Sequence, residues 1–199
     1  MSRLLLIGPP GAGKGTQAVR LADVYAVPAI STGDIFRSNV KNETELGKQA
    51  KAFMDAGDNV PDSLTNELIR SRLAEEDAEG GFLLDGYPRT ADQVRELDEY
   101  LATHGTQLDV VVELVADPDV VIERLRKRAT EQGRSDDDES VVRHRLEVYR
   151  DQTAPLIDIY DARGVLVKVN AIGEIGEVTQ RIVDALSARG LTNSLPSAH

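Results

Sequence analysis

The sequence predicts an α/β fold built on a doubly wound, five-stranded parallel sheet with helices on both faces. Five short apolar runs alternate along the 199 residues with longer segments of helical period. Runs such as FLLD at 82–85 and VVVEL at 110–114 are almost continuously apolar, which is typical of strands covered on both faces by helices. The length and the hydrophobic share of 41% suffice for one domain with a sizeable core.

The expected strands lie at residues 3–7, 27–30, 81–84, 109–115 and 165–169, and a stretch that can form a helix follows each of them. Residues 32–78 contain helical patterns without a strand, which is too much chain for one crossover, so we predict a helical insert there. Residues 129–138 lack apolar periodicity and lie between two strong helix patterns, which predicts a solvent-exposed loop. The polar segment from Gly190 onward is expected to fray.

The charge balance and the absence of cysteine exclude several classes of function. With 34 acidic residues against 23 basic ones, the formal net charge is −11. Such a surface repels phosphate backbones and anionic lipid head groups, so we expect no nucleic-acid and no membrane partner. Without cysteine there can be no disulfide, thiolate nucleophile or cysteine-based zinc site. The first apolar run, residues 4–7, is far shorter than a signal sequence or a membrane span, so we expect a cytoplasmic protein.

A glycine-rich motif follows the first expected strand and precedes the first expected helix. Gly8, Gly13 and Lys14 have the spacing G-x-x-x-x-G-K of a P-loop in the strand-to-helix context that this motif requires. Glycines let backbone amides approach a phosphate, and the lysine reaches the outer phosphates, so a nucleoside triphosphate is the expected ligand. Gly15 stands where the general motif has Ser or Thr for Mg²⁺, and Thr16 follows it. We therefore expect Mg²⁺ to be held by phosphate oxygens and by waters that a carboxylate orients.

The supply of arginine is a second signal for a phosphate ligand. The chain has 17 Arg against 6 Lys, and several of the arginines crowd into residues 124–150. Arg124 and Arg128 are spaced i, i+4, so they share one face of a helix and can converge on one polyphosphate. Other arginines and the histidines are expected at the solvated surface, without a catalytic role. They are Arg126, Arg143, Arg150, His104, His144 and His199.

Six segments carry a resemblance to the adenylate kinase family. They are GPPGAGKGTQ (8–17), STGDIFR (31–37), MDAGDNV (54–60), FLLDGYPRTADQ (82–93), the arginine cluster at 124–145 and TAPL (153–156). The chain resembles the family from Arg3 to about Arg189. The resemblance implies reversible phosphoryl transfer, MgATP + AMP ⇌ 2 ADP, on a P-loop core with an AMP-binding insert and a short lid. It implies ATP, AMP and ADP as partners and Mg²⁺ as the cofactor. Longer lids of the family sometimes hold zinc, but this short lid has no cysteine, so we expect no zinc.

The resemblance assigns the ATP site residue by residue. Lys14 is expected on the β- and γ-phosphates, and Arg124 and Arg128 on the ATP phosphates, whereas Arg134 and Arg145 close onto the phosphates of both substrates. The other expected ATP contacts are Gly11, Ala12, Gly13, Gly15, Thr16 and Gly173. Asp85, at the carboxyl end of an expected central strand, is the best carboxylate for Mg²⁺-bound water. The implied catalytic set is Lys14, Arg89, Arg124, Arg128, Arg134 and Arg145.

The AMP site follows from the same resemblance. Arg37 and Arg89 match the pair that grips the AMP α-phosphate, and the Gln93 amide offers a donor and an acceptor to the adenine edge. The other expected AMP contacts are Thr32, Asp58, Asn59, Val60, Gly86, Tyr87, Pro88, Arg134 and Arg145. The resemblance also implies a cis Tyr87–Pro88 peptide. Uridylate and cytidylate kinases are the near alternative, and Gln93 favours adenine.

We expect one kinase domain and a monomer. The core is assigned to residues 1–30, 61–128 and 139–190, the insert for the nucleoside monophosphate to 31–60, the lid to 129–138 and a flexible tail to 191–199. A P-loop GTPase is disfavoured, because the chain lacks the N-K-x-D guanine signature and a Ser or Thr directly after Lys14. A nonenzymatic nucleotide-binding regulator would have no reason to keep the arginines of both sites together.

Overall fold

The chain forms a five-stranded parallel sheet in the order β2-β3-β1-β4-β5. The computed structural model describes residues 2–192. Its strands are β1 (Arg3–Ile7), β2 (Ala29–Ser31), β3 (Phe82–Asp85), β4 (Val110–Val115) and β5 (Leu166–Asn170). The predicted fold class is confirmed, and each predicted strand is found within two residues of its expected position. The central strand β1 pairs with β3 on one side and with β4 on the other, so it is buried on every side.

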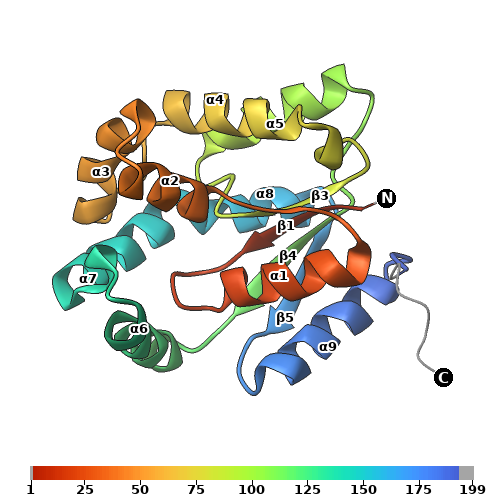
Figure 1. Cartoon of the computed structure of the whole chain (residues 1–199). Coiled ribbons are helices and arrows are strands. Elements are labelled where there is room, and N and C mark those ends of the chain that lie inside the picture. Colours follow the sequence, from red (N-terminus) through yellow and green to blue (C-terminus); the bar gives the residue numbers. More distant parts are fainter. Residues whose placement is uncertain (1, 193–199) are drawn as a thin grey trace.

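Helices cover both faces of the sheet (Figure 1). One layer contains α1 (Lys14–Tyr25) and α9 (Ile175–Ser187), which pack on the side of Leu4 and Leu6. The other layer contains α4 (Asp62–Leu73), α5 (Ala91–Thr103) and α8 (Pro155–Ala162), which pack on the side of Leu5 and Ile7. Successive residues of a strand point to opposite faces, so the continuous apolar run of β1 supplies both cores at once.

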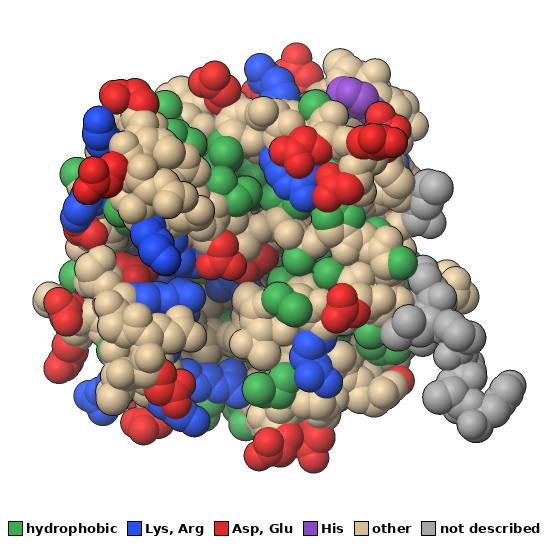
Figure 2. All heavy atoms as spheres, in the orientation of Figure 1, with side chains coloured by type: hydrophobic (Ala, Val, Ile, Leu, Met, Phe, Trp, Pro, Cys, Tyr) green, Lys and Arg blue, Asp and Glu red, His purple; other side chains and the backbone are tan. Residues whose placement is uncertain are grey.

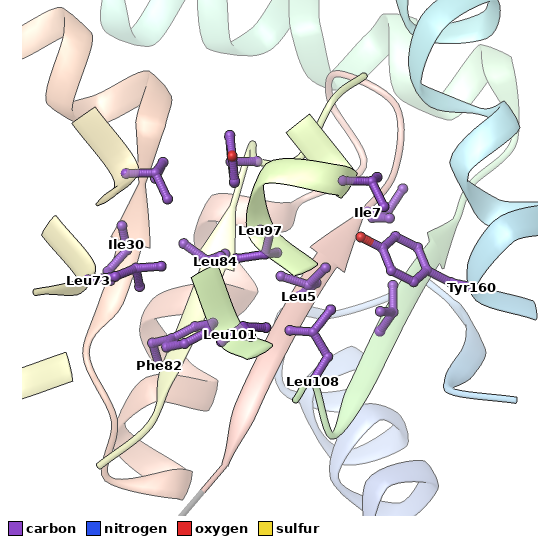
Figure 3. Close-up of a cluster of buried hydrophobic side chains, with 14 of the residues drawn as sticks. Leu5, Ile7, Ile30, Leu73, Phe82, Leu84, Leu97, Leu101, Leu108 and Tyr160 are labelled. Carbon is purple, nitrogen blue, oxygen red and sulfur yellow. The ribbon is translucent and has the colours of Figure 1, made fainter. Parts of the chain in front are cut away.

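The larger core lies under α4, α5 and α8 (Figure 3). Leu5, Leu84 and Val111 of the sheet are fully buried in it. Leu97 of α5 and Tyr160 of α8 close the cluster from the helical side. This packing fixes the strands whose carboxyl ends carry the P-loop and Asp85.

Residues 32–78, predicted as helical, contain no strand. They form α2 (Thr32–Lys41), α3 (Glu45–Ala56), α4 and the short 3-10 turn η1 (Glu76–Ala78); α2 and α3 lie in the insert of residues 31–60, whereas α4 packs on the sheet. The side chains of Ser31 and Thr44 accept hydrogen bonds from the backbone of the first turns of α2 and α3, which defines where these helices begin. Phe36, Ala50 and Val60 form a small core of their own, separate from the two sheet cores.

The loop predicted at 129–138 is shorter in the structure. The helix α6 (Pro118–Gln132) continues through residues 129–132 and ends at Gly133, whose φ of 58° is left-handed. The last turn of α6 has no apolar periodicity because it lies at the surface, so that part of the loop prediction was wrong. A 3-10 turn, η2 (Ser135–Asp137), leads into α7 (Glu139–Val148) and a π-helical segment, η3 (Tyr149–Thr153). Most of the predicted tail, residues 193–199, lies outside the described residues.

Candidate active site

The P-loop connects β1 to α1 at the carboxyl edge of the sheet. Gly11 and Gly13 have left-handed φ values of 86° and 94°. A Cβ on Gly11 would lie 2.8 Å from the carbonyl oxygen of Val121 and 2.9 Å from Leu125 Cγ, so only glycine lets the loop pack against α6. The loop and the first residues of α1 line an open hollow, and a glycine-rich loop at a helix N-terminus is the setting in which backbone amides bind phosphate.

Lys14 reaches back over the loop. Its Nζ donates hydrogen bonds to the carbonyl oxygens of Gly8 at 2.8 Å and Pro9 at 3.1 Å. Burial lowers the pKa of Lys14 to about 8; nearby Asp85 raises it, and Arg89 and Arg145 lower it further. The ammonium group is therefore surrounded by more positive than negative charge and is poised for an anionic ligand.

Arg124 ties α6 to the phosphate loop. Its Nη1 donates to the carbonyl oxygen of Ala12 at 3.3 Å, and its Nη2 donates to that of Ala171, directly after β5, at 2.8 Å. The predicted shared face of Arg124 and Arg128 is real, because both line the hollow beside the P-loop. Arg126 between them is exposed, as predicted.

A buried ion cluster joins the loop after α6 to its two flanking helices. Arg128 donates from Nε to Oδ2 of Asp137 at 2.6 Å, and Arg145 Nη1 donates to Oδ1 of the same carboxylate at 2.9 Å. Burial opposes ionisation of Asp137, but its bonds to Arg128 outweigh it and hold the pKa of the carboxyl below its usual range. Burial also lowers the pKa values of Arg134 and Arg145.

Two hollows meet on four cations, Lys14, Arg37, Arg89 and Arg145, which line both of them. The first hollow is lined by the predicted AMP residues Thr32, Arg37, Asp58, Asn59, Val60, Gly86, Pro88, Arg89, Gln93 and Arg145. The second is lined by the predicted ATP residues Gly11, Ala12, Gly13, Lys14, Gly15, Thr16, Arg124, Arg128, Arg134, Arg145 and Gly173, and by Asp85. Figure 2 shows Lys and Arg side chains gathered where the surface is hollowed, beside the helical insert.

Two residues predicted to contact AMP, Tyr87 and Arg134, do not line the first hollow. The Tyr87 side chain is buried away from the hollows, where its hydroxyl donates to Asn66 Oδ1 at 2.8 Å, and the Tyr87–Pro88 peptide is cis as expected. Arg134 was assigned to both substrates, but it lines only the second hollow. Arg37 borders both hollows, and its Nη2 is 2.5 Å from Asp34 Oδ1.

The Asp85 carboxylate fits the role of holding Mg²⁺-bound water. It lies at the end of β3, is 8% exposed, and its Oδ2 is 3.7 Å from where a Cβ of Gly15 would stand. Within residues 2–192, no group of three or more His, Asp or Glu side chains is arranged to hold a metal ion. A single carboxylate beside the phosphate loop suits Mg²⁺, which keeps several waters and binds through substrate phosphates.

The insert touches α7 and η2 across the hollows. His144 Nε2 lies 2.5 Å from Asp58 Oδ1, and Ser135 Oγ donates to Asp55 Oδ1 at 2.9 Å. The side chains of His144 and His104 remain partly or fully exposed, as predicted, whereas His199 lies outside the described residues.

Comparisons with known proteins identify the family. A sequence model of the family described as Adenylate kinase matches residues 6–165. The adenylate kinase of Leifsonia xyli subsp. xyli is 60% identical over 188 residues, which cover 94% of this chain and 94% of that protein. The chain belongs to the adenylate kinase family. Other adenylate kinases are similar to it, from Kocuria rhizophila (59% over 186 residues, 94% of this chain and 99% of that protein) and from Thermobifida fusca (59% over 187 residues, 94% and 99%).

Family membership establishes the class of enzyme. The chain is a nucleoside monophosphate kinase, a phosphotransferase with adenylate kinase activity. In this adenylate kinase family member, no helix within residues 2–192 combines the length and apolar character needed to cross a membrane.

Sequence reasoning missed several residues of this adenylate kinase site. Phe36, Met54 and Thr65 line the first hollow, and a helical pattern alone does not tell such lining residues from core. Asp137 and Asp62 pair with arginine and glutamine side chains that lie 9 and 31 residues away in the sequence. Only the run of acidic residues at 136–139 hinted at the first pair, and no spacing signalled the second.

Proposed function

We propose that the chain transfers the γ-phosphoryl group of MgATP reversibly to AMP, with ATP in the hollow beside the P-loop and AMP in the hollow beside the insert. The observation that carries this assignment is that Lys14, Arg37, Arg89 and Arg145 border both hollows. A phosphoryl group in transfer would lie between the two nucleotides, where these cations converge. In this arrangement the charge of the transferring group is compensated from both sides.

The proposed chemistry needs positioning and charge compensation more than proton transfer. The attacking oxygen belongs to the AMP phosphate, which is already anionic, so no general base is required. Lys14 holds the outer phosphates of ATP with the backbone of residues 11–16, and Arg124 and Arg128 hold them from α6. Arg37 and Arg89 hold the AMP phosphate, and Arg145 bridges the two.

Magnesium belongs to the ATP side of this proposal. Asp85 would hold waters of the Mg²⁺ ion, which supplies charge neutralisation to the phosphates when it is bound. Thr16 borders the same hollow.

We assign the insert to residues 31–60 and the lid to residues 129–138, as moving parts on the core of residues 1–30, 61–128 and 139–190. The arginines of the site are distributed over these parts: Arg37 is on α2 and Arg134 follows α6. The insert and the lid contact each other through hydrogen bonds between exposed side chains, such as that of Ser135 with Asp55, which can break and reform. Closure of both parts would complete the cationic set and exclude water, which would otherwise accept the phosphoryl group.

One assay tests the proposal directly. MgATP is combined with AMP, UMP, CMP or GMP, and ADP formation is followed; AMP should be the best acceptor by far. Lys14→Met should reduce the rate about 10³- to 10⁵-fold, because charge compensation of the transferring group is worth that much in related phosphoryl transfers. Lys48→Met is the matched control, since Lys48 is exposed on α3. A better rate with CMP or UMP, or normal turnover by Lys14→Met, would contradict it.

A further inference from the structure

The Gln93 carboxamide is buried and held on both of its polar atoms. Gln93 is 1% exposed, at the first turn of α5. Its Nε2 donates to Oδ1 of Asp62 at 2.8 Å, and its Oε1 accepts from the backbone N–H of Arg89 at 2.7 Å. Thr90 Oγ1 lies 3.1 Å from both oxygens of Asp62, so the carboxylate is itself held in place.

These two partners allow one orientation of the amide. An ionised carboxylate can only accept hydrogen bonds, and a backbone N–H can only donate. If the carboxamide were flipped, Gln93 Oε1 would face the Asp62 carboxylate and Nε2 would face the Arg89 N–H. Both contacts would then be repulsive in a buried site, which is costly.

The locked amide has one hydrogen and one lone pair left over. An amide has two N–H donors and two acceptor lone pairs, and Asp62 and Arg89 each use one of them. Gln93 also borders the first hollow, beside Val60 and Thr65. A purine that enters there meets a fixed pair of groups, a donor at Nε2 and an acceptor at Oε1.

That pair matches one kind of purine edge. Adenine presents an acceptor at N1 and a donor at its 6-amino group, so both bonds can form. Hypoxanthine and guanine present a donor at N1 and an acceptor at O6, so both contacts would be mismatched unless the amide turns over.

We infer that Asp62 is a positioning residue that determines base specificity, because it prevents the Gln93 carboxamide from turning over to accept a 6-oxopurine. The inference rests on the proposed placement of AMP in the first hollow. Asp62 does not touch the phosphates, and it lies on α4, away from the P-loop. Its effect is therefore confined to the acceptor base.

The test compares AMP with IMP as acceptors. The two nucleotides differ only at the N1 and C6 edge, so their ratio of kcat/KM reports the orientation of the amide. Asp62→Asn retains the shape, but its side chain can offer either an oxygen or an NH₂ group to Gln93. We expect the AMP/IMP ratio to fall about tenfold or more, since one charged hydrogen bond no longer enforces the orientation. The KM for MgATP should stay unchanged.

Glu67→Gln is the matched control, because Glu67 is exposed on the same helix and the change removes the same charge. Its AMP/IMP ratio should equal that of the unmodified protein. If Asp62→Asn does not fold, Asp62→Ser is the second variant; its hydroxyl can donate or accept, and Ser suits the start of a helix. A folded Asp62 variant that loses rate equally with AMP and IMP, or keeps the original ratio, would overturn the inference. Failure of the proposed function would show differently, as an unmodified protein that does not prefer AMP.

Discussion

The guanidinium of Arg128 and the carboxylate of Asp137 form a bidentate ion pair, and the Asp137 side chain has no exposed surface. Arg145 donates a further bond to the same carboxylate. Loss of the acid would leave two cations without their counter-charge. We expect Asp137→Ala to reduce the free energy of unfolding by about 3 kcal/mol, at the low end for a broken buried pair because Arg128 is 23% exposed and partly solvated. Urea denaturation at pH 7 measures this.

The neighbouring Asp138 provides the control, because its side chain is exposed and makes no capping bond, so Asp138→Ala should change stability by less than about 0.5 kcal/mol. The pKa of Asp137 is lowered in the folded protein, so its stabilisation is fully present above the unfolded value near 4 and is lost as the pH falls through the folded value. Equal stability of both variants would contradict the role of the ion pair.

The pKa of Lys14 predicts a pH profile. Burial lowers this pKa to about 8, so the free enzyme should lose affinity for MgATP above that pH as the ammonium group loses its proton. We expect kcat/KM for MgATP to fall with an apparent pKa near 8, and kcat to fall only at higher pH, because bound phosphates favour the charged form. A kcat/KM that is flat up to pH 9.5 would refute this assignment.

Deprotonation of Lys14 also affects stability: as the pH rises it lowers kcat/KM for MgATP but increases the free energy of unfolding. Between pH 8 and 10.5 the unfolded chain binds the proton of Lys14 and the folded chain does not, so this residue makes stability rise with pH in that window. Below pH 8 the desolvated Lys14 ammonium is charged and lowers the free energy of unfolding. Lys14→Met should therefore melt at a higher temperature than the unmodified protein at pH 7, and the difference should shrink toward pH 10.5.

Two helical glycines predict opposite effects of the same substitution. A Cβ on Gly47 would lie 2.1 Å from the carbonyl oxygen of Asn39, so Gly47→Ala must separate α2 from α3 and should cost about 1 to 3 kcal/mol. A Cβ on Gly176 in α9 would meet nothing within 4 Å, and Gly176→Ala should be neutral or stabilise by up to about 1 kcal/mol. Denaturant midpoints of the two variants decide; a destabilised Gly176→Ala or a neutral Gly47→Ala would disagree with the packing.

The buried tyrosines predict a second contrast. No hydrogen-bond partner for the Tyr160 hydroxyl is found among the described residues, whereas that of Tyr87 donates to Asn66. Tyr160→Phe should leave stability unchanged or raise it, and Tyr87→Phe should lower it by about 1 kcal/mol. Thermal melts of the two variants give the comparison, and a larger loss for Tyr160→Phe would contradict it.

Closure can be followed with labels, because the chain has no cysteine of its own. Lys48→Cys on α3 and Asp138→Cys before α7 place exposed labels on the proposed insert and lid. The distance between them should shorten when a ligand that spans both hollows is added. Gly57→Ala should oppose that shortening, because its Cβ would lie 2.9 Å from both Val141 Cγ1 and Arg145 Cγ. An unchanged distance on ligand addition would exclude the closing motion.

The parts of the fold and site that could be predicted are those whose signal is continuous in the sequence. The apolar run of β1 and the glycines before Lys14 define a strand, a loop and a helix from adjacent residues, and the structure has all three. The last turn of α6 was missed because residues 130–132 are polar, and only the Gly133 C-cap marks the end of the helix. The pairing of Asp62 with Gln93 depends on how α4 packs near α5, which no local spacing encodes.

Arg124 bonds at once to the P-loop and to the segment after β5, so three separate stretches of chain form one rigid wall before any nucleotide arrives. The donor nucleotide would thus meet a surface whose ordering entropy has already been lost during folding. The acceptor side depends on contacts between the insert and α7, such as that of Asp58 with His144, which must reform each time the insert closes, so this side would bear most of the ordering on binding. An asymmetry of this kind predicts a smaller entropic penalty for binding ATP than for binding AMP, which calorimetry on the two nucleotides can measure.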